Sequence, residues 1–244
     1  MRWLGNLQRP ALSARVARAL ALELRAMEFD VDFAPVADIH SNPNNPVIGD
    51  RAFGREAAQV ARQMQAFIPA MQEQGIIACA KHFPGHGDTH TDSHLELPVV
   101  EEDPDRMIQR EIVPFQAAIA CGVGTIMTAH VLYPGFDEDD PATMSQKILK
   151  RLLREKLGFS GILISDDLEM KAALESLKKR MEQTATVREP VHAGQIIHVM
   201  GAKGGVGTTT VTITATDASG NSTSCTPRCR HWSWNWRIAG RGSG

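Results

Sequence analysis

A helical pattern followed by a strand pattern, repeated four times within the first 175 residues, constrains the fold of this chain most strongly. An amphipathic helix is predicted over 11–28 because an apolar residue recurs every four positions, at Leu12, Val16, Leu20 and Leu24. The apolar run over 31–37 then predicts a strand. The succession returns about every 45 to 50 residues. Helix and strand units in tandem predict an α/β fold built on a parallel sheet.

The three later units follow the same rule. Helices are expected over 60–71, 107–115 and 145–157, and the strands that follow them over 76–80, 123–129 and 161–165. Ser145 is suited to cap the start of the last helix, and Gly158 to end it.

Polar residues follow the predicted strands at the same place in every unit. They are Asp38 and His40, Lys81 and His82, His130, and Asp166 with Asp167. The carboxyl ends of parallel strands form one face, where the ligand sites of α/β proteins are built. Residues as far apart in sequence as these are therefore expected to converge on one substrate.

The segment from Lys81 to His94 contains four histidines, two aspartates and a lysine. We expect it to lie outside the core and to serve chemistry or metal binding. The histidines are spaced by four, which on a helix would form a metal-binding stripe. However, Pro84, Gly85 and Gly87 prevent a regular helix there, which disfavours a metal site. An inert solvated loop remains the plain alternative.

Two other candidates also have purely structural interpretations. Of Asp166 and Asp167, one can cap a helix that begins near Leu168 while the other faces the pocket. Arg51 lies in a glycine-flanked loop and could simply pair with a surface carboxylate.

Five segments in order carry a resemblance to a known family. Over residues 11–175 the chain resembles the β-N-acetylhexosaminidases of glycoside hydrolase family 3, on the segments 33–38, 49–54, 81–87, 92–94 and 165–170. The resemblance implies a (β/α)8 TIM barrel, incomplete here because about four βα units are present. The family's substrate-clamping Asp and Arg, on loops of the first two barrel strands, have no counterpart in this chain.

The same resemblance implies retaining hydrolysis of terminal β-linked N-acetylglucosamine, typically in peptidoglycan fragments, without metal or organic cofactor. The nucleophile corresponds to Asp166, and the general acid/base to His94, whose ring would be oriented by Asp92. These two would ride on a mobile loop, for which Gly85 and Gly87 are suited. The sugar hydroxyls would be held by Arg51, Lys81 and His82. The expected partner is a carbohydrate, and the complete enzyme is expected to be a monomer.

The remaining third of the chain follows a different pattern. A partial family domain over 1–175 is expected to be followed by a linker over 176–193, a phosphate-loop-like fragment over 194–216 and a disordered tail over 217–244. Residues 201–210 resemble the phosphate loop of septum-site and partition-type ATPases, although Thr208 replaces its usual lysine. Residues 211–216 alternate like a strand where that loop should begin a helix. The alternatives to the glycosidase are therefore a nucleotide-binding module, or a truncated or chimeric chain without function.

Composition limits the other classes of function. With 43% hydrophobic and 22% charged residues and a net charge of −2, the chain is an ordinary globular protein that has no basic surface for nucleic acid. It has no signal-like or membrane-spanning run, so we expect a cytoplasmic location without membrane contact. The four cysteines form no disulfide framework. A half barrel would also expose the backbone edges of its terminal strands, so poor folding or aggregation of this chain alone is expected.

Overall fold

The computed structural model describes residues 1–90, 97–184, 197–200, 212–216 and 222–225. The chain divides into two compact units, Met1–Arg188 and Glu189–Gly244. The helices of the first unit are α1 (Arg2–Asn6), α2 (Pro10–Ala26), the short 3-10 helix η1 (Gly49–Arg51), α3 (Ala57–Gln72), α4 (Pro104–Gln109), α5 (Val113–Ala120), the π-helix η2 (Lys147–Lys156) and α6 (Lys171–Thr184). Its strands are β1 (Val31–Asp32), β2 (Ile77–Phe83), β3 (Thr125–Thr128) and β4 (Ile162–Ser165).

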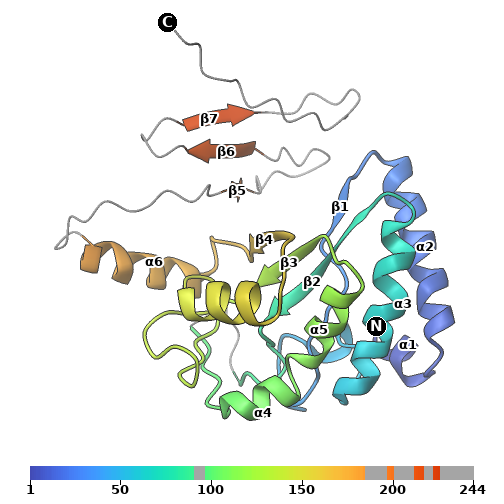
Figure 1. Cartoon of the computed structure of the whole chain (residues 1–244), viewed down its shortest axis with the longest axis horizontal. Coiled ribbons are helices and arrows are strands. Elements are labelled where there is room, and N and C mark those ends of the chain that lie inside the picture. Colours follow the sequence, from blue (N-terminus) through green and yellow to red (C-terminus); the bar gives the residue numbers. More distant parts are fainter. Residues whose placement is uncertain (91–96, 185–196, 201–211, 217–221, 226–244) are drawn as a thin grey trace, which may run out of the picture. The chain divides into compact units, whose positions relative to one another are not determined.

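The four strands form one sheet in the order β1-β2-β3-β4 (Figure 1). Every neighbouring pair is parallel, with Val31 opposite Ile77, Cys79 opposite Thr125, and Thr125 opposite Ile162. Sequential parallel order is the strand arrangement of a (β/α)8 barrel. The predicted parallel α/β architecture is confirmed.

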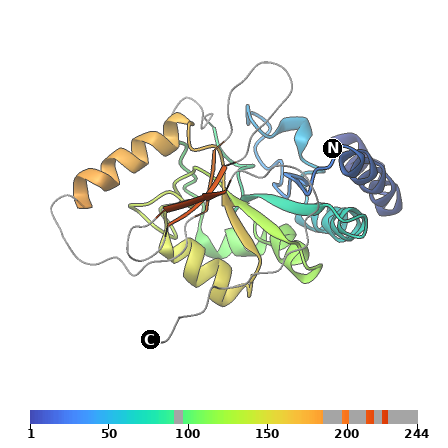
Figure 2. The same ribbon diagram turned by 90° about the horizontal axis from the view of Figure 1, so that it is seen from above.

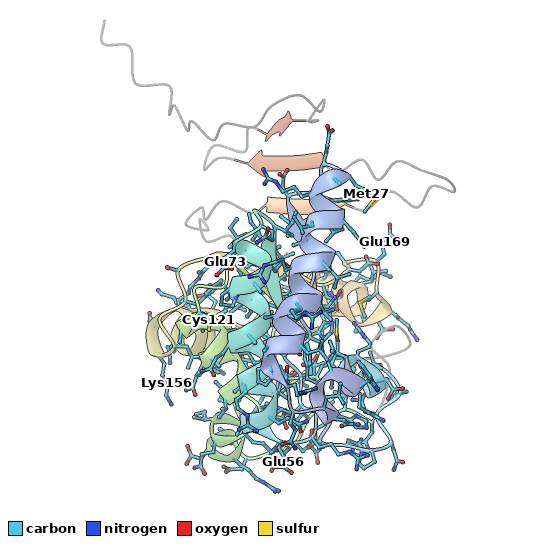
Figure 3. All side chains as sticks on the ribbon, turned by 90° about the vertical axis from the view of Figure 1, so that its right-hand side faces the viewer. Met27, Glu56, Glu73, Cys121, Lys156 and Glu169 are labelled. Carbon is cyan, nitrogen blue, oxygen red and sulfur yellow. The ribbon has the colours of Figure 1, made fainter. Side chains whose placement is uncertain are left out.

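The helices lie along the outer side of these strands (Figure 2). Helices α2 and α3 run side by side (Figure 3), and α3 also packs against α5. Four phenylalanines are completely buried between helices and sheet, namely Phe53, Phe67, Phe83 and Phe115. The Phe83 and Phe115 rings meet edge to face with centroids 5.2 Å apart, so β2 and α5 are joined through aromatic contact.

Two predicted elements differ in detail from the observed ones. The single helix expected over 107–115 is two helices, α4 and α5, because Pro114 lacks the N–H that would continue the first helix. The strand expected over 31–37 is regular only at Val31–Asp32. Beyond it, Ala37 N still donates to the Lys81 carbonyl (2.7 Å), but Pro35 has no N–H to contribute to the ladder.

In the last unit both residues predicted to mark the ends of the helix do so. The helix itself, η2, is a π-helix and not the expected α-helix. Ser145 Oγ accepts from Ile148 N at 3.1 Å, and Gly158 has a left-handed φ of 72°. The next helix, α6, begins at Lys171 rather than near Leu168, and it extends to Thr184, so the first part of the predicted linker is helical.

The two edge strands of the sheet are less buried than the two central ones. All four residues of β3 are buried, whereas no residue of β1 or β4 is. Ile162 of β4 is 48% exposed, and Phe33 after β1 is 43% exposed. Both edges of the described sheet therefore leave apolar side chains partly uncovered.

The second unit contains three described strands, β5 (Ile197–Met200), β6 (Thr212–Thr216) and β7 (Ser222–Cys225), paired antiparallel in that order. The strand-like alternation noted over 211–216 agrees with β6, but the tail was not expected to contain β7. The phosphate-loop-like residues 201–210 lie outside the described residues. Among the helices that the structure describes, none has the length and apolar character needed to cross a membrane.

Candidate active site

The carboxylate of Asp38, just beyond β1, organises the polar residues at the ends of the strands. It is completely buried and accepts from the backbone N–H of His82 (3.1 Å) and of His86 (2.7 Å). Its Oδ2 also lies 2.7 Å from His82 Nδ1. Burial alone would raise the pKa of Asp38, but the charge and hydrogen bonds of His82 and His86 outweigh it, so the pKa is lowered. Asp38 is therefore held ionised and fixes the end of β2.

The histidine-rich segment is packed inside the protein at its start, contrary to the prediction that no core would accept it. His82 and His86 are only 3% and 2% exposed, and Thr89 is completely buried. The prediction was wrong because it counted polar residues without their partners. His82 contacts Asp38, His86 Nδ1 lies 2.8 Å from Thr89 Oγ1, and exposed His90 has its Nδ1 3.2 Å from Asn42 Nδ2.

Asn45 ties this segment to the loop that follows β1. Its Nδ2 donates to the carbonyls of His86 (2.9 Å) and Gly87 (3.2 Å), and its Oδ1 accepts from the N–H of Val47 and Ile48. One buried amide therefore satisfies backbone groups of two loops.

Gly85 and Gly87 have roles other than the expected flexibility. A Cβ on Gly87 would lie 1.5 Å from the Ile39 carbonyl oxygen, so only glycine permits this approach of two backbones. Gly85 has a φ of 135°, and its carbonyl accepts from the buried Tyr133 hydroxyl at 2.9 Å. Up to Thr89, the segment is thus a fixed part of the core.

Asp166 and Asp167 have different partners, but the predicted helix cap is not observed because α6 begins only at Lys171. Asp167 Oδ1 accepts from Glu169 N in the turn before α6, whereas Asp166 Oδ2 faces His82 Nε2 at 3.8 Å. The Asp166 side chain is 25% exposed. Asp166 therefore offers a partly exposed carboxylate oxygen beside a fixed imidazole.

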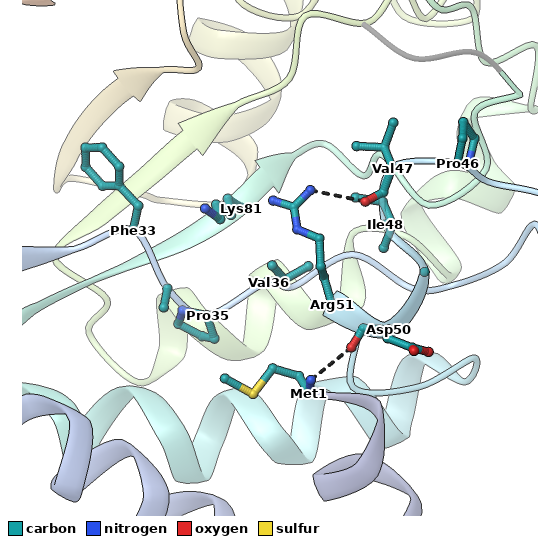
Figure 4. Close-up of a pocket in the computed structure, with 12 residues that line it drawn as sticks. Met1, Phe33, Pro35, Val36, Pro46, Val47, Ile48, Asp50, Arg51 and Lys81 are labelled. Carbon is teal, nitrogen blue, oxygen red and sulfur yellow. Dashed lines mark hydrogen bonds between the residues drawn. The ribbon is translucent and has the colours of Figure 1, made fainter. Parts of the chain in front are cut away.

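Lys81 and Arg51 lie at an open pocket of about 550 Å³ beside the end of β1 (Figure 4). Arg51 Nη1 donates to the Val47 carbonyl at 3.2 Å. Burial and the nearby Arg51 charge lower the pKa of Lys81, while the charge of Asp166 opposes the shift. Asp166 and His82 are not among the described residues that line this pocket, but Lys81, which does line it, is close enough to Asp166 for their charges to interact.

Of the six predicted site residues, the structure brings Lys81, His82 and Asp166 together at the carboxyl ends of β2 and β4, with Arg51 beside Lys81. The predicted acid/base pair, Asp92 and His94, falls in 91–96, outside the described residues. Sequence reasoning assigned no role to Asp38, although its place after a strand was noticed. It missed Asn45, whose role depends on a partner loop about 40 residues away.

The comparisons agree on one family. Residues 1–208 match the model of the glycosyl hydrolase family 3 N-terminal domain, which extends past the boundary predicted at 175. A beta-hexosaminidase of Nitrosomonas eutropha is 42% identical over 191 residues, covering 75% of this chain and 54% of that protein. Beta-hexosaminidase A of Pseudoalteromonas piscicida is 42% identical over 170 residues, covering 65% of this chain and 28% of that protein.

Solved structures give the same result. A family 3 beta-N-acetylglucosaminidase of a Paenibacillus species superposes with a TM-score of 0.70 at 43% identity, covering 71% of this chain and 33% of that one. Native NagZ of Neisseria gonorrhoeae has a TM-score of 0.62 at 37% identity, covering 69% and 51%. The chain thus spans about half, or less, of the length of these relatives. Its sheet is part of their barrel, and the chain belongs to glycosyl hydrolase family 3.

Proposed function

We propose that this chain supplies the catalytic side of a glycoside hydrolase that removes terminal β-linked N-acetylglucosamine from glycans, with peptidoglycan fragments as the natural substrate class. The relatives named beta-hexosaminidase and beta-N-acetylglucosaminidase support this reaction.

The observation that carries the proposal is the pairing of Asp166 with His82 at the ends of β4 and β2. Asp38 accepts from His82 Nδ1, so in the neutral ring Nε2 is free to accept from a sugar hydroxyl next to Asp166. Lys81 and Arg51 bring positive charge to the same edge, suited to sugar oxygens.

The chemistry proceeds in two displacements. An Asp166 carboxylate oxygen attacks the anomeric carbon while the bond to the leaving oxygen breaks and that oxygen takes a proton from His94. Water then attacks the glycosyl-enzyme, gives its proton to His94 and releases Asp166, so the anomeric configuration is retained. Asp92 would orient the His94 ring.

The test is hydrolysis of a chromogenic N-acetylglucosaminide. We expect Asp166→Ala to abolish turnover, and His94→Ala to reduce it less for a good leaving group, because such a group departs without a proton. Leu22→Lys, an exposed change on α2, serves as the control. Hydrolysis that survives Asp166→Ala and disappears with a chelator would contradict the proposal.

The nucleotide-binding alternative is not proposed. A phosphate loop presents its backbone N–H groups at the start of a helix. Here the first described element after residues 201–210 is strand β6, paired with β5 and β7.

A further inference from the structure

A chain of hydrogen bonds runs from β3 to the end of β4 through the buried ring of His130. His130 is 1% exposed and follows β3. Its Nδ1 lies 2.9 Å from Thr143 Oγ1, and its Nε2 lies 3.0 Å from the Asp167 carbonyl oxygen. Thr143 Oγ1 is also 3.0 Å from Thr128 Oγ1 and 3.0 Å from the Ala129 carbonyl oxygen.

The partners determine where the protons lie. A carbonyl oxygen only accepts, so His130 Nε2 carries a hydrogen and donates it to Asp167. In a neutral ring Nδ1 then accepts. The single hydrogen of the Thr143 hydroxyl is shared between two acceptors, His130 Nδ1 and the Ala129 carbonyl oxygen, so Thr143 Oγ1 itself accepts from the Thr128 hydroxyl. The neutral ring agrees with burial, which lowers the pKa of His130 even though the Asp166 charge opposes the shift.

These bonds affect Asp166, because both backbone polar groups of the next residue, Asp167, are hydrogen-bonded. Its carbonyl accepts from His130, and its N–H donates to Asp166 Oδ1 at 2.9 Å. The other oxygen, Asp166 Oδ2, then faces His82. This turn follows an edge strand, so it lacks the support that a further neighbouring strand in the described sheet would give.

We propose that His130 is a positioning residue. The chain Thr128, Thr143, His130 holds the Asp167 backbone so that the Asp166 carboxylate keeps the orientation needed to attack the anomeric carbon. This proposal rests on the proposed glycosidase function. The group that contacts the sugar is Asp166, and His130 acts through it.

Thr143→Val tests the proposal because it removes the hydroxyl and keeps the shape of the side chain. Thr143→Ser is the conservative variant. Thr125→Val is the matched control, a buried threonine of β3 whose hydroxyl donates to the Ala78 carbonyl at 3.0 Å and has no bond to Thr143 or His130 among the described residues. We expect Thr143→Val to lower kcat by about 10- to 100-fold with little change in KM. The loss should be equal for good and poor leaving groups, and Thr143→Ser should restore most of the rate.

A readout that needs no turnover separates this proposal from the proposed function. Carbon-13 spectra of the aspartate carboxyls, with Asp166→Asn to assign the signal, should show a shifted Asp166 signal in Thr143→Val and an unchanged one in Thr125→Val. Nitrogen-15 spectra should show the His130 ring neutral with hydrogen on Nε2 at pH 7. If the wild-type protein does not hydrolyse the substrate, the proposed function fails. The two spectra still test whether His130 positions the Asp166 carboxylate. Equal effects of Thr143→Val and Thr125→Val, or a His130 ring protonated on Nδ1 at pH 7, would overturn it.

Discussion

Glu111 is a buried carboxyl beneath the histidine-rich segment. It is 1% exposed, and its Oε1 lies 2.8 Å from Arg110 Nε. Burial raises the pKa of Glu111 from its ordinary 4.5 to about 7, although the neighbouring Arg110 opposes the shift. The folded protein therefore binds a proton that the unfolded chain has already released between these two values.

Stability should for that reason fall as pH rises through this window. A raised carboxyl pKa contributes stability below the unfolded value and loses it as pH passes the folded value. Glu111→Gln removes the effect, so its free energy of unfolding relative to wild type should rise between pH 5 and pH 8, by about 2 to 3 kcal/mol. Urea unfolding at a series of pH values measures this, with the exposed Glu155→Gln as control. A difference that does not depend on pH would contradict the prediction.

Gly87 is a residue at which adding a single methyl group should be costly. Gly87→Ala places a Cβ against the Ile39 carbonyl, so one of the two backbones must move. We expect a loss of at least about 3 kcal/mol in the free energy of unfolding. The control is Gly122→Ala, whose φ of 72° is also unfavourable for alanine but whose Cβ would have open space. It should cost only about 1 to 2 kcal/mol. Equal losses would show that the close approach does not matter.

At the scale of elements, the order of helices and strands was predictable, whereas contacts between distant segments were not. The four-residue spacing in α2 and the alternation of helices and strands were sufficient to predict the sheet, because apolar periodicity is local. The split between α4 and α5 was readable from Pro114. The burial of His82 and His86 was not readable, since it depends on Asp38, which lies more than 40 residues earlier in the chain. Asp166 was placed correctly because strand ends of a parallel sheet share one edge.

The loop after β1 and the segment after β2 should behave as one element, joined by Asn45. Asn45→Ala leaves the amides of Val47 and Ile48 and two carbonyls of the other loop without this partner. We expect a loss of about 2 to 4 kcal/mol in stability, and faster hydrogen exchange at the amides of Val47 and Ile48. Asn44→Ala, a change at an exposed neighbour, should have little effect. Unchanged hydrogen exchange in Asn45→Ala would show that Asn45 does not join the two loops into one element.

At the scale of the whole molecule, the predicted incomplete barrel of family 3 is confirmed, and its open margins have a measurable consequence. In the described sheet, β1 and β4 are edge strands, with exposed apolar residues at Phe33 directly after β1 and at Ile162 in β4. Unpaired strand edges bind other edges, so the isolated chain of 244 residues should associate as its concentration rises.

Sedimentation velocity over a concentration series measures this association. Ile162→Lys puts a charge on β4 and should weaken it. Leu22→Lys, at an exposed position of similar apolar character on α2, should not. A monomer at all concentrations, with a sharp two-state melt, would show that the edges are protected.

The sequential order of the sheet also bears on how the molecule forms during synthesis. Each strand pairs with the strand just before it in the chain, so each pairing closes a loop of only about 40 to 50 residues. Pairing can therefore advance unit by unit as the chain leaves the ribosome. The polar groups behave differently, because Asp38 and His82 meet after two strands, whereas Asp166 reaches His82, and Asp167 reaches His130, only after the fourth. The Asp166 carboxylate, proposed above as the nucleophile, is thus added last, after Asp38, Lys81, His82 and His130 have been brought to the strand ends.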